Sequence, residues 1–519
     1  MNKITTRIYA FTDTQLIAVF TLASAVLTAW IMYLQHGWIT EDSILYFEVA
    51  RLFSNGEWQQ GFALYGWPLY PALITILHKL TGLGIQQAAQ AWNIFFFALT
   101  TYGFLTFIRV AGGGKQVIIC GALLLFSAPY IVGDILPMLL RDQGFWAFFL
   151  LSLGFLLSFH RTGEFKYALH WQICIIIAML FRIEAFVYLL LAPLFMLRNT
   201  NKTLQQRLYS YGQTQILTLV AGAGLGLLLA FSPTLQLDDL GRIRELFTTF
   251  SRLYGQLTEG LAAKAQLMGE MVLGKYLDDY GMLSILLALA SIVMIKSIGA
   301  AGWSTMLVLA MPQPERLHGL KEDARELIIW VIAIGAAIAS IIILNRFILS
   351  SRYLAPSAFI MLLLCAFALS NMWTYLRSRS SAELIRPLTF SVILLLVCLS
   401  FIKNIMPLGA DHNFEQTAVA WTQERSTPQT KIFISDAKLR YYAGQSYDGR
   451  DDPWQWTLDA IKDQSIYGYD YLILSLSGAK IAEQQKYLST MLSQYELVNQ
   501  FQRGTRKVVL IYKSADLAK

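Results

Sequence analysis

The chain has 519 residues, of which 55% are hydrophobic and only 14% are charged, and its mean hydropathy is +0.48. This composition predicts an integral membrane protein and excludes an ordinary soluble enzyme. The four cysteines lie in apolar runs, which excludes a disulfide framework, and the six histidines lack metal-ligand spacing, so we expect no structural metal site.

The formal net charge of +7 belongs entirely to the membrane part of the chain. From Asp411 onward there are 13 Lys and Arg against 13 Asp and Glu, a net charge of zero. The excess of basic residues lies beside the apolar runs, where membrane topology places it. A nucleic-acid partner is therefore not expected.

Lys3 and Arg7 precede an apolar run at 14–34. This pattern could be a signal peptide cleaved at Ala23-Ser24-Ala25, but the apolar run continues past that site, as a cleaved signal would not. We therefore expect a permanent first span. Further runs of about span length follow at 87–108, 116–133, 144–159, 168–181, 184–197, 213–232, 281–297, 327–345, 353–374 and 388–405.

The fifth and sixth runs are short for a bilayer core and could form one helix interrupted by Arg182 and Glu184. Charge favours two spans, because a single helix would place basic loop residues such as Arg198 and Arg207 outside, against the positive-inside rule. The sequence therefore predicts a polytopic α-helical membrane protein with about eleven transmembrane helices and an inner N-terminus.

Residues 407–519, here called the tail, are expected to form a small soluble α/β domain. Strand-like runs occur at 431–435, 469–475, 495–501 and 507–512, and helical patterns separate the first three. The tail shows no nucleophile–base pair and no metal-ligand constellation. We interpret it as a cap or an acceptor-binding module on the outer side, with a purely structural role as the alternative.

In this topology, the membrane part at 1–406 presents its loops at 35–86, 134–143 and 233–280 on the outer face. Carboxylates and arginines from distant parts of the chain gather on that face, which predicts a functional site there. They are Glu41 and Asp42, Arg141 and Asp142, Arg182 and Glu184, and Arg346 and Arg352.

The first outer loop has too regular a pattern to be a simple connector. After the acidic pair, a short helical pattern ends at Asn55-Gly56, and an aromatic–proline cluster at 65–71 starts a second amphipathic helix. Four segments, in order, then resemble one known family. They are Asp42, Tyr46, Ala50-Arg51-Leu52, Gly56 and Pro68-Leu69-Tyr70-Pro71 of this loop; LLRDQGFWAFF with Asp142; FRIEAF with Arg182 and Glu184; and Arg352-Tyr353-Leu354-Ala355-Pro356.

These segments resemble the GT-C superfamily of polytopic glycosyltransferases. The resemblance covers about 1–360 and is strongest to bacterial lipid-linked-sugar transferases related to protein O-mannosyltransferases and to the aminoarabinose transferase of lipid A. This chain departs from the family at Trp67, where a second proline is frequent, and in having about eleven spans where close relatives commonly have more.

The resemblance implies a GT-C-like fold in a bacterial inner membrane and transfer of a hexose or pentose from a polyprenyl-phosphate carrier. The acceptor would be a hydroxyl of a glycan, lipid or protein at the outer face. The resemblance implies no certain cofactor, and the need for a divalent cation is left open.

An alcohol is a poor nucleophile, so a carboxylate must accept its proton as the new glycosidic bond forms. The leaving lipid phosphate needs a fixed cation. On the resemblance, we assign Asp42 as the general base, with Glu41 as its rival, and Arg352 as the phosphate clamp. A single carboxylate acting through the acceptor implies inversion.

The other candidates assist the donor or the acceptor. Asp142 would orient the acceptor or share the base role, and Arg141 or Arg182, the latter beside Glu184, would supply a second cation. Aromatic rings would stack on the sugar or line the lipid groove. These rings belong to Tyr46, Trp67, Tyr70 and Tyr353.

Each candidate also has a structural interpretation. Asp42 could cap a helix beginning near Ser43, Asp142 could pair with Arg141, and Arg352 could anchor to a lipid headgroup. The tyrosines and Trp67 could be interfacial belt residues. Two other classes of function compete: a flippase of lipid-linked sugars, which would need mid-membrane charges and an internal repeat that we do not find, and a non-catalytic scaffold.

Overall fold

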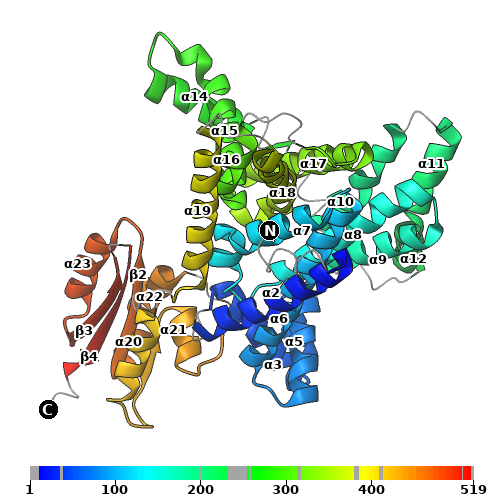
Figure 1. Cartoon of the computed structure of the whole chain (residues 1–519). Helices are drawn as coiled ribbons and strands as arrows, with labels where there is room; N and C mark the ends of the chain where they lie inside the picture. The colour runs from blue at the N-terminus through cyan, green and yellow to red at the C-terminus, as the bar shows by residue number, and fades with distance from the viewer. Residues whose placement is uncertain are drawn as a thin grey trace. The chain divides into compact units, whose positions relative to one another are not determined.

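The computed structural model describes residues 11–34, 39–198, 202–231, 254–255, 259–311, 317–378, 385–407, 413–447, 449, 452–504 and 506–515. Within these ranges the chain forms two compact units (Figure 1). The first comprises Met1–Trp30, Ala91–Leu136 and Arg141–Ile405, and the second comprises Ile31–Gln90, Pro137–Leu140 and Met406–Lys519. The sequence predicted a division at residue 406, between the membrane part and the tail. In the structure, the first outer loop belongs to the same unit as the tail.

Helices dominate the membrane part of the chain. In order they are α2 (Asp13–Leu34), α6 (Ile85–Val110), α7 (Lys115–Phe126), η1 (Pro129–Ile135), α8 (Asp142–Thr162), α9 (Phe165–Phe181), α10 (Ala185–Leu191), η2 (Ala192–Arg198), α11 (Leu204–Gln213), α12 (Ile216–Phe231), α14 (Leu261–Leu267), η5 (Met268–Leu273), η6 (Asp278–Tyr280), α15 (Gly281–Ala301), α16 (Trp303–Ala310), α17 (Glu322–Arg346), η7 (Ser351–Leu354), α18 (Ala355–Ser378) and α19 (Ile385–Ile405). Half of the outer loop predicted at 233–280, comprising 233–253 and 256–258, lies outside the described residues.

Seven of the described helices are long and apolar enough to cross a membrane, or eight if the bent pair α7 and η1 is one span. That pair bends by 42° at Pro129, which has no backbone N–H to continue an α-helix. The fifth, sixth and seventh predicted spans are shorter: α9 has 17 residues, α10 with η2 covers Ala185–Arg198, and α12 has 16 residues. The predicted class of polytopic helical membrane protein is confirmed.

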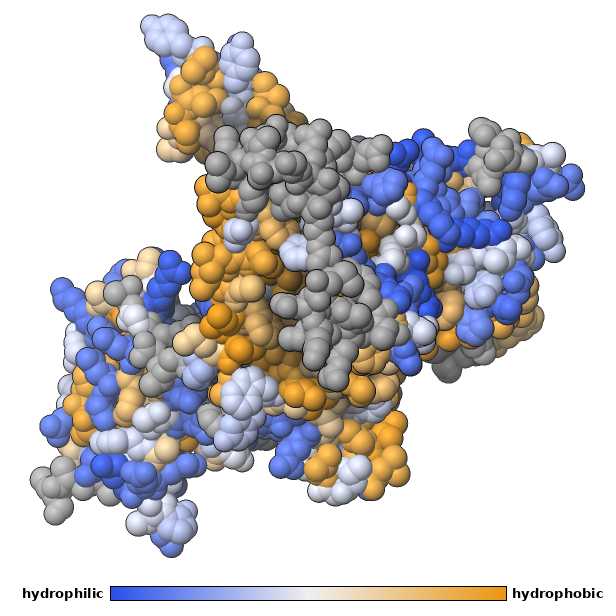
Figure 2. Space-filling model, viewed as in Figure 1, coloured by the Kyte–Doolittle hydropathy of each residue, from blue (hydrophilic) through white to orange (hydrophobic). Residues whose placement is uncertain are grey.

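Apolar side chains face outward along several of these helices. The hydrophobic surface in Figure 2 includes α15 and α19 of the first unit, where Leu286 and Leu287, and Leu395 and Leu399, are exposed. Only 11% of the apolar window of α15 and 22% of that of α19 is buried within the protein. A helix with so much exposed apolar surface is stable when acyl chains, rather than water, surround it.

The first outer loop folds into three helices: α3 (Glu41–Ser54), α4 (Trp58–Leu64) and α5 (Leu69–Thr81). Thr40 caps α3, because its hydroxyl accepts a hydrogen bond from the Ser43 backbone N–H at 3.3 Å in a capping box. Gly56, with φ of +85°, provides the left-handed turn into α4. Helices α3 and α5 lie side by side (Figure 1), and the Thr75 hydroxyl donates to the Ala50 carbonyl at 3.1 Å.

The tail forms a four-stranded sheet in the order β1-β2-β4-β3. Its strands, β1 (Ile432–Ile434), β2 (Tyr471–Ser477), β3 (Tyr495–Arg503) and β4 (Lys507–Ser514), coincide with the four predicted runs. The β1–β2 pair is parallel and the other two pairs are antiparallel. The predicted α/β tail is confirmed.

Apolar residues alternate between the two faces of this sheet, so helices cover both faces. On one face Ile473 and Ile511 pack with α20 (Phe414–Gln423) and α21 (Ala437–Tyr442). On the other face Leu472 and Leu510 pack with α22 (Pro453–Lys462) and α23 (Ile481–Met491). The sheet lies between helices α20 and α23 in Figure 1. The tail is therefore a three-layer α/β/α domain.

A buried group of charged side chains lies within the tail. The Lys507 ammonium donates to Glu415 at 2.6 Å and to Asp436 at 3.0 Å, and Asp436 also caps α21. Burial would raise the pKa of Asp436, but the Lys507 ammonium and hydrogen bonds from Lys507 and the Lys438 backbone hold that pKa below its ordinary value. The folded tail thus favours the ionised carboxylate.

We expect the tail to lose stability in acid. Because the pKa of Asp436 is lower in the folded than in the unfolded chain, its contribution is complete above the unfolded value of about 3.9 and disappears as pH falls through the folded value. Hydrogen exchange of the β1 and β4 amides in the full-length protein, corrected for intrinsic rates, should accelerate between about pH 5 and about pH 3. Asp436→Asn should flatten this dependence, and an unchanged profile would contradict the role of Asp436.

Candidate functional site

The first unit brings together six predicted site residues around the start of α8, namely Arg141, Asp142, Arg182, Glu184, Arg352 and Tyr353. Asp142 is the first residue of this helix, where the helix dipole favours a carboxylate. Two residues on, Gly144 lies directly against the Phe181 ring; a side chain at Gly144 would come within 2.5 Å of that ring. This close packing of α8 on the end of α9 brings Arg182, which follows Phe181, next to Asp142.

The Asp142 carboxylate lies between two guanidinium groups. Its Oδ2 accepts from Arg352 Nη2 at 2.7 Å, and its Oδ1 accepts from Arg352 Nε at 3.3 Å and from Arg182 Nη1. The Asp142 side chain is completely buried, and that of Arg182 is only 4% exposed. Both carboxylate oxygens are thus engaged by arginine donors.

Arg182 has further partners. It lies in the break between α9 and α10, and its Nη2 and Nε donate to Glu184 at 3.0 and 3.3 Å. Its guanidinium lies 4.7 Å from the centre of the Tyr353 ring, within the range of a cation–π contact. The break after α9 therefore brings Arg182 and the partly exposed Glu184 into one hydrogen-bonded network with Asp142.

Arg352 differs from Arg182 in its access. The Arg352 side chain is 23% exposed, whereas the Asp142 side chain that it binds is completely buried. Ser350 caps the short η7 helix by accepting from the Arg352 backbone N–H at 3.4 Å, which orients the residue. Of the two arginines that bind Asp142, Arg352 is therefore the one whose guanidinium an incoming ligand can reach.

A third arginine lies close to this network. Arg141, which is 7% exposed, interacts electrostatically with Asp142 and Glu184. Arginine side chains from three separate segments therefore gather at the start of α8, and guanidinium groups are the usual partners of phosphate and carboxylate anions. We call Arg141, Asp142, Arg182, Glu184 and Arg352 the arginine cluster.

Tyr130 is a neighbour of the cluster that the sequence interpretation did not include. Its hydroxyl hydrogen-bonds Ser350, and the ring lies within electrostatic reach of Asp142 and Arg352. Tyr130 belongs to η1, directly after Pro129, in a segment that reads as an ordinary apolar span. The proline inside that run was the available signal, because it marks a break in the helix where polar groups can gather.

Glu184→Gln is expected to destabilise the first unit by about 1–3 kcal/mol, because it replaces a charged acceptor of two arginine hydrogen bonds with a neutral one. Thermal unfolding of the purified protein in a fixed detergent would measure the loss. Glu164→Gln is the matched control, since Glu164 pairs with Lys166 through side chains that are about half exposed. Equal effects of the two substitutions would contradict a stabilising role for the pairing of Glu184 with Arg182.

The remaining predicted residues belong to the second unit. Asp42 is partly exposed and Glu41 exposed in the first turn of α3. Since Thr40 caps this helix, the interpretation of Asp42 as its cap is wrong. Asp42 belongs to the second unit and Arg352 to the first. The proximity of these two side chains therefore stays a prediction.

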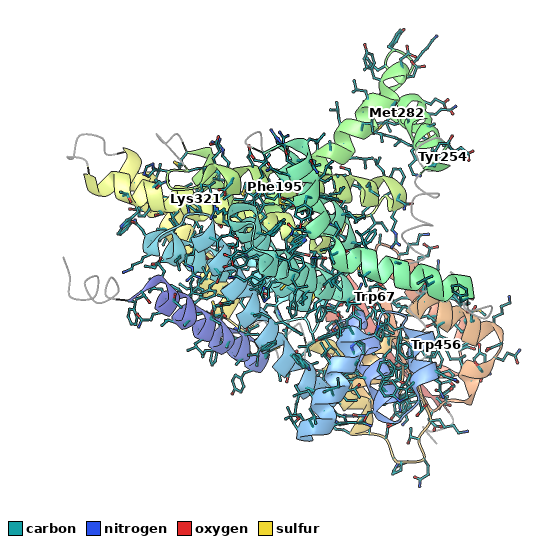
Figure 3. The ribbon with its side chains drawn as sticks, turned by 90° about the vertical axis from the view of Figure 1, so that its right-hand side faces the viewer. Trp67, Phe195, Tyr254, Met282, Lys321 and Trp456 are labelled. Atoms are coloured by element: carbon teal, nitrogen blue, oxygen red, sulfur yellow. The ribbon has the colours of Figure 1, made fainter. Side chains whose placement is uncertain are left out.

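The aromatic residues of the first outer loop pack against protein. The Tyr46 ring centroid lies 5.4 Å from those of Tyr65 and Tyr70. Tyr46 is 2% exposed, Tyr70 1% and Trp67, labelled in Figure 3, 8%. These rings stabilise the contact among α3, α4 and α5, and their predicted stacking on a sugar stays a prediction.

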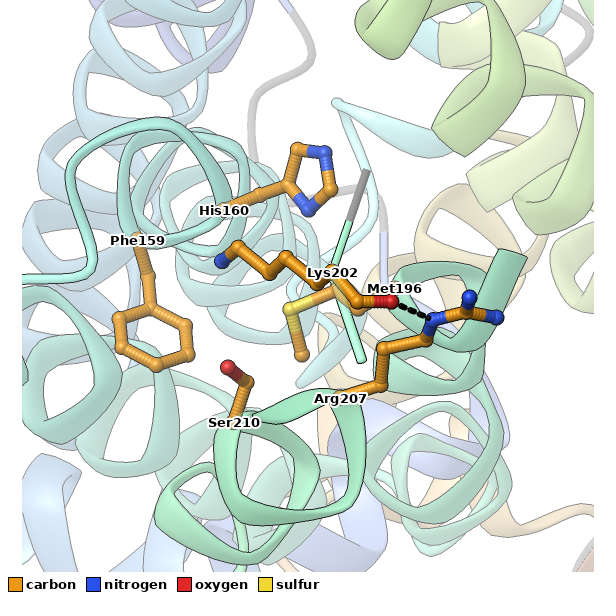
Figure 4. Close-up of a pocket in the computed structure, with 6 residues that line it drawn as sticks. All are labelled: Phe159, His160, Met196, Lys202, Arg207 and Ser210. Atoms are coloured by element: carbon orange, nitrogen blue, oxygen red, sulfur yellow. Dashed lines mark hydrogen bonds between the residues drawn. The ribbon is translucent and has the colours of Figure 1, made fainter. Parts of the chain in front are cut away.

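A small cavity lies apart from the arginine cluster. His160, Lys202 and Arg207 are among the residues that line it, and Arg207 Nε donates to the Lys202 carbonyl at 2.8 Å (Figure 4). Its volume is about 10 Å³, the room of one water molecule. This cavity is too small for a sugar. Among the described residues, no three His, Cys, Asp or Glu side chains are grouped to hold a metal ion.

Comparisons with known proteins concern the fold. No family model matches the sequence, and no curated protein matches it. The structure is similar to that of ArnT from Cupriavidus metallidurans bound to undecaprenyl phosphate, with a TM-score of 0.41 and 14% identity over 96% of this chain and 98% of that chain.

Two further solved structures are similar to this chain. One is the archaeal oligosaccharyltransferase AglB from Archaeoglobus fulgidus in complex with an inhibitory peptide and a dolichol-phosphate, with a TM-score of 0.49 and 11% identity over 94% of this chain and 74% of that chain. The other is the arabinofuranosyltransferase AftD from Mycobacteria, with a TM-score of 0.48 and 14% identity over 96% of this chain and 40% of that chain.

Proposed function

We propose that this protein is a membrane glycosyltransferase that moves a sugar from a polyprenyl-phosphate carrier to an acceptor hydroxyl at the outer face of the membrane. One observation carries the proposal: the partly exposed Arg352 is held by the buried Asp142 carboxylate, which also binds a second arginine, Arg182. Such a cluster suits an anion that lies at the membrane boundary, as the phosphate of a lipid carrier does.

Sugar transfer from a lipid phosphate requires a cation beside the phosphate that leaves. As the bond between the anomeric carbon and the phosphate oxygen breaks, its electron pair stays on the lipid phosphate, which gains negative charge. A guanidinium group fixed in place before the reaction stabilises that charge without reorganising at the transition state. Arg352 supplies the group, and Asp142 holds it in position by two hydrogen bonds.

Asp142 fits a positioning role better than a basic one. Its two oxygens accept hydrogen bonds from Arg182 and Arg352, and none of its surface is exposed to an acceptor hydroxyl. Arg182, in turn, is held by Glu184 and lies against Tyr353. We therefore assign Asp142 and Glu184 to the orientation of the arginines, and Arg182 to the second cation.

The acceptor side is assigned to Asp42. Its carboxylate would accept the proton of the acceptor hydroxyl while the hydroxyl oxygen bonds to the anomeric carbon. The motif of the first outer loop supports this assignment, as does the partial exposure of Asp42 in a helical turn that Thr40 already caps. A single base acting through the acceptor inverts the anomeric configuration.

The test combines the cell envelope with the purified protein. Mass spectrometry of envelope glycans and lipids, with and without the protein, should reveal one sugar that depends on it. Purified protein in nanodiscs should bind undecaprenyl phosphate, and binding should weaken in Arg352→Ala. An envelope that keeps every sugar without the protein, together with lipid-phosphate binding that does not need Arg352, would overturn the proposal.

A further inference from the structure

The second unit contains a cavity that the proposed donor chemistry does not use. It has a volume of about 870 Å³ and is lined by α3, by His78 of α5, by the residues around the start of α6, and by the end of α21 with the loop that follows. This volume lies in the range of sites that hold small molecules. The cavity is built entirely from the first outer loop and the tail, the two parts that pack into one unit.

Several side chains of the lining offer hydrogen bonds in both directions. Three side-chain amides, those of Gln86, Gln87 and Gln445, each provide donors and an acceptor, and the hydroxyls of Ser446 and Tyr447 do the same. Sugar hydroxyls are likewise both donors and acceptors, so a wall of amides and hydroxyls matches them. The aromatic rings of the lining offer faces on which the C–H side of a sugar ring can pack.

Among the described residues, the lining has no group of arginines or lysines, and it is held in place. Its one described arginine, Arg51, pairs with Glu48 within α3 at 2.6 Å. Its other basic side chain is that of His78, whose Nδ1 lies 2.6 Å from the Leu83 carbonyl oxygen. The Tyr441 hydroxyl donates to Gln86 at 2.9 Å, and its ring lies 5.6 Å from that of Phe47. Burial raises the pKa of Tyr441 to about 12, so this hydroxyl stays a donor at neutral pH.

The same chemistry argues against a peptide. A peptide in an extended form needs an open strand edge, and an amphipathic peptide needs a deep apolar groove. The described residues that line the cavity belong to helices and a loop and not to a strand, and amide and hydroxyl side chains interrupt its apolar surface, which is the larger part. An uncharged ligand with many hydroxyls satisfies the lining better than either form of peptide.

We infer that this cavity binds a neutral oligosaccharide, which serves as the glycan acceptor of the transfer. The role as acceptor rests on the proposed function, whereas the binding of the glycan does not. The tail then has a function of its own, because together with α3, which carries Asp42, it holds the acceptor by sugar units other than the one that reacts.

The experiment uses the full-length protein in nanodiscs, with an array of short neutral and acidic bacterial oligosaccharides and a set of peptides as probes. The test variant is Ser446→Trp, which places an indole in the cavity. Its matched control is Ser489→Trp, which changes an exposed serine on α23, on the far face of the tail sheet from α21. Undecaprenyl phosphate binding is measured in parallel as an independent property and as a check on folding.

We expect the wild type to retain neutral oligosaccharides from the array. Ser446→Trp should weaken that binding about tenfold or more, Ser489→Trp should leave it unchanged, and both should bind undecaprenyl phosphate normally. Tyr441→Phe, which removes only the hydrogen bond to Gln86, should weaken glycan binding to a smaller extent. Arg352→Ala should show the reverse pattern, with glycan binding kept and lipid-phosphate binding reduced.

Three outcomes would overturn the inference. They are retention of peptides in place of glycans, glycan binding that Ser446→Trp and Ser489→Trp affect equally, and no glycan binding by a protein that still binds undecaprenyl phosphate. Each leaves the proposed transfer intact. Glycan binding by a protein that shows no lipid-phosphate binding would instead count against the proposed transfer and not against the cavity.

Discussion

Asp42→Asn is expected to lower the rate of sugar transfer by about 10²–10⁴-fold, the usual contribution of a general base. The substitution keeps the size of the side chain and one oxygen, but the amide cannot accept the proton of the acceptor hydroxyl. Because Thr40 caps α3, the helix should keep its start and the protein should still insert and fold. Transfer is measured with radiolabelled polyprenyl-phosphate sugar in vesicles that contain the purified protein.

Glu41→Gln is the matched control for this prediction. Glu41 precedes Asp42, lies in the same helical turn and is more exposed. It should keep most of the activity, and both variants should bind undecaprenyl phosphate as the wild type does. Normal turnover in Asp42→Asn would rule out Asp42 as the base, and a loss confined to Glu41→Gln would transfer that role to its neighbour.

Arg352→Ala is expected to lower transfer by about 10²–10³-fold, the loss seen when a preorganised group that stabilises developing charge is removed. The effect should appear both in the maximal rate and in the dependence of the rate on lipid-linked donor, because Arg352 would contact the phosphate before and during bond cleavage. The Arg352→Ala substitution also removes two of the hydrogen bonds that the Asp142 carboxylate accepts, so a modest loss of thermal stability should accompany the loss of activity. Initial rates over a series of donor concentrations measure both effects.

Two further substitutions test whether transfer depends on the positive charge of Arg352 alone or also on the geometry and position of its guanidinium group. Arg352→Lys keeps the positive charge but loses the two-pronged contact with Asp142, so it should recover only part of the activity. Arg346→Ala, which removes an exposed arginine at the end of α17, should have little effect. An unchanged donor dependence in Arg352→Ala would contradict the phosphate clamp.

Sequence pattern predicts the local structure well, as the tail and the first outer loop show. All four strand-like runs became strands, because alternation of apolar residues is a property of neighbouring residues in the chain. The predicted turn at Asn55-Gly56 is likewise where α3 ends. The start of α3 was less well predicted: Thr40, rather than Asp42, provides the cap, and the choice between two nearby polar residues depends on backbone geometry.

The ion-pair partners of Asp142 could not be predicted from residue spacing. The neighbouring Arg141 was the natural candidate for an ion pair, yet the carboxylate binds Arg182 and Arg352, which lie 40 and 210 residues away. The turn after α9 and the cap at Ser350 bring these arginines to α8. Similarly, the tyrosines of the first outer loop fit a membrane-interface belt by composition, and only their packing shows that Tyr46 and Tyr70 are buried.

From the sequence alone come the membrane class, the spans, the α/β tail and the residue types of the candidate site, because hydrophobicity and periodicity are encoded over short stretches. Tertiary structure decided which arginines hold Asp142, which of them stays reachable, and that the first outer loop and the tail enclose a cavity lined by amides and hydroxyls. These properties depend on contacts between segments tens to hundreds of residues apart, and the packing free energy that selects such contacts belongs to the whole fold rather than to any stretch of the chain.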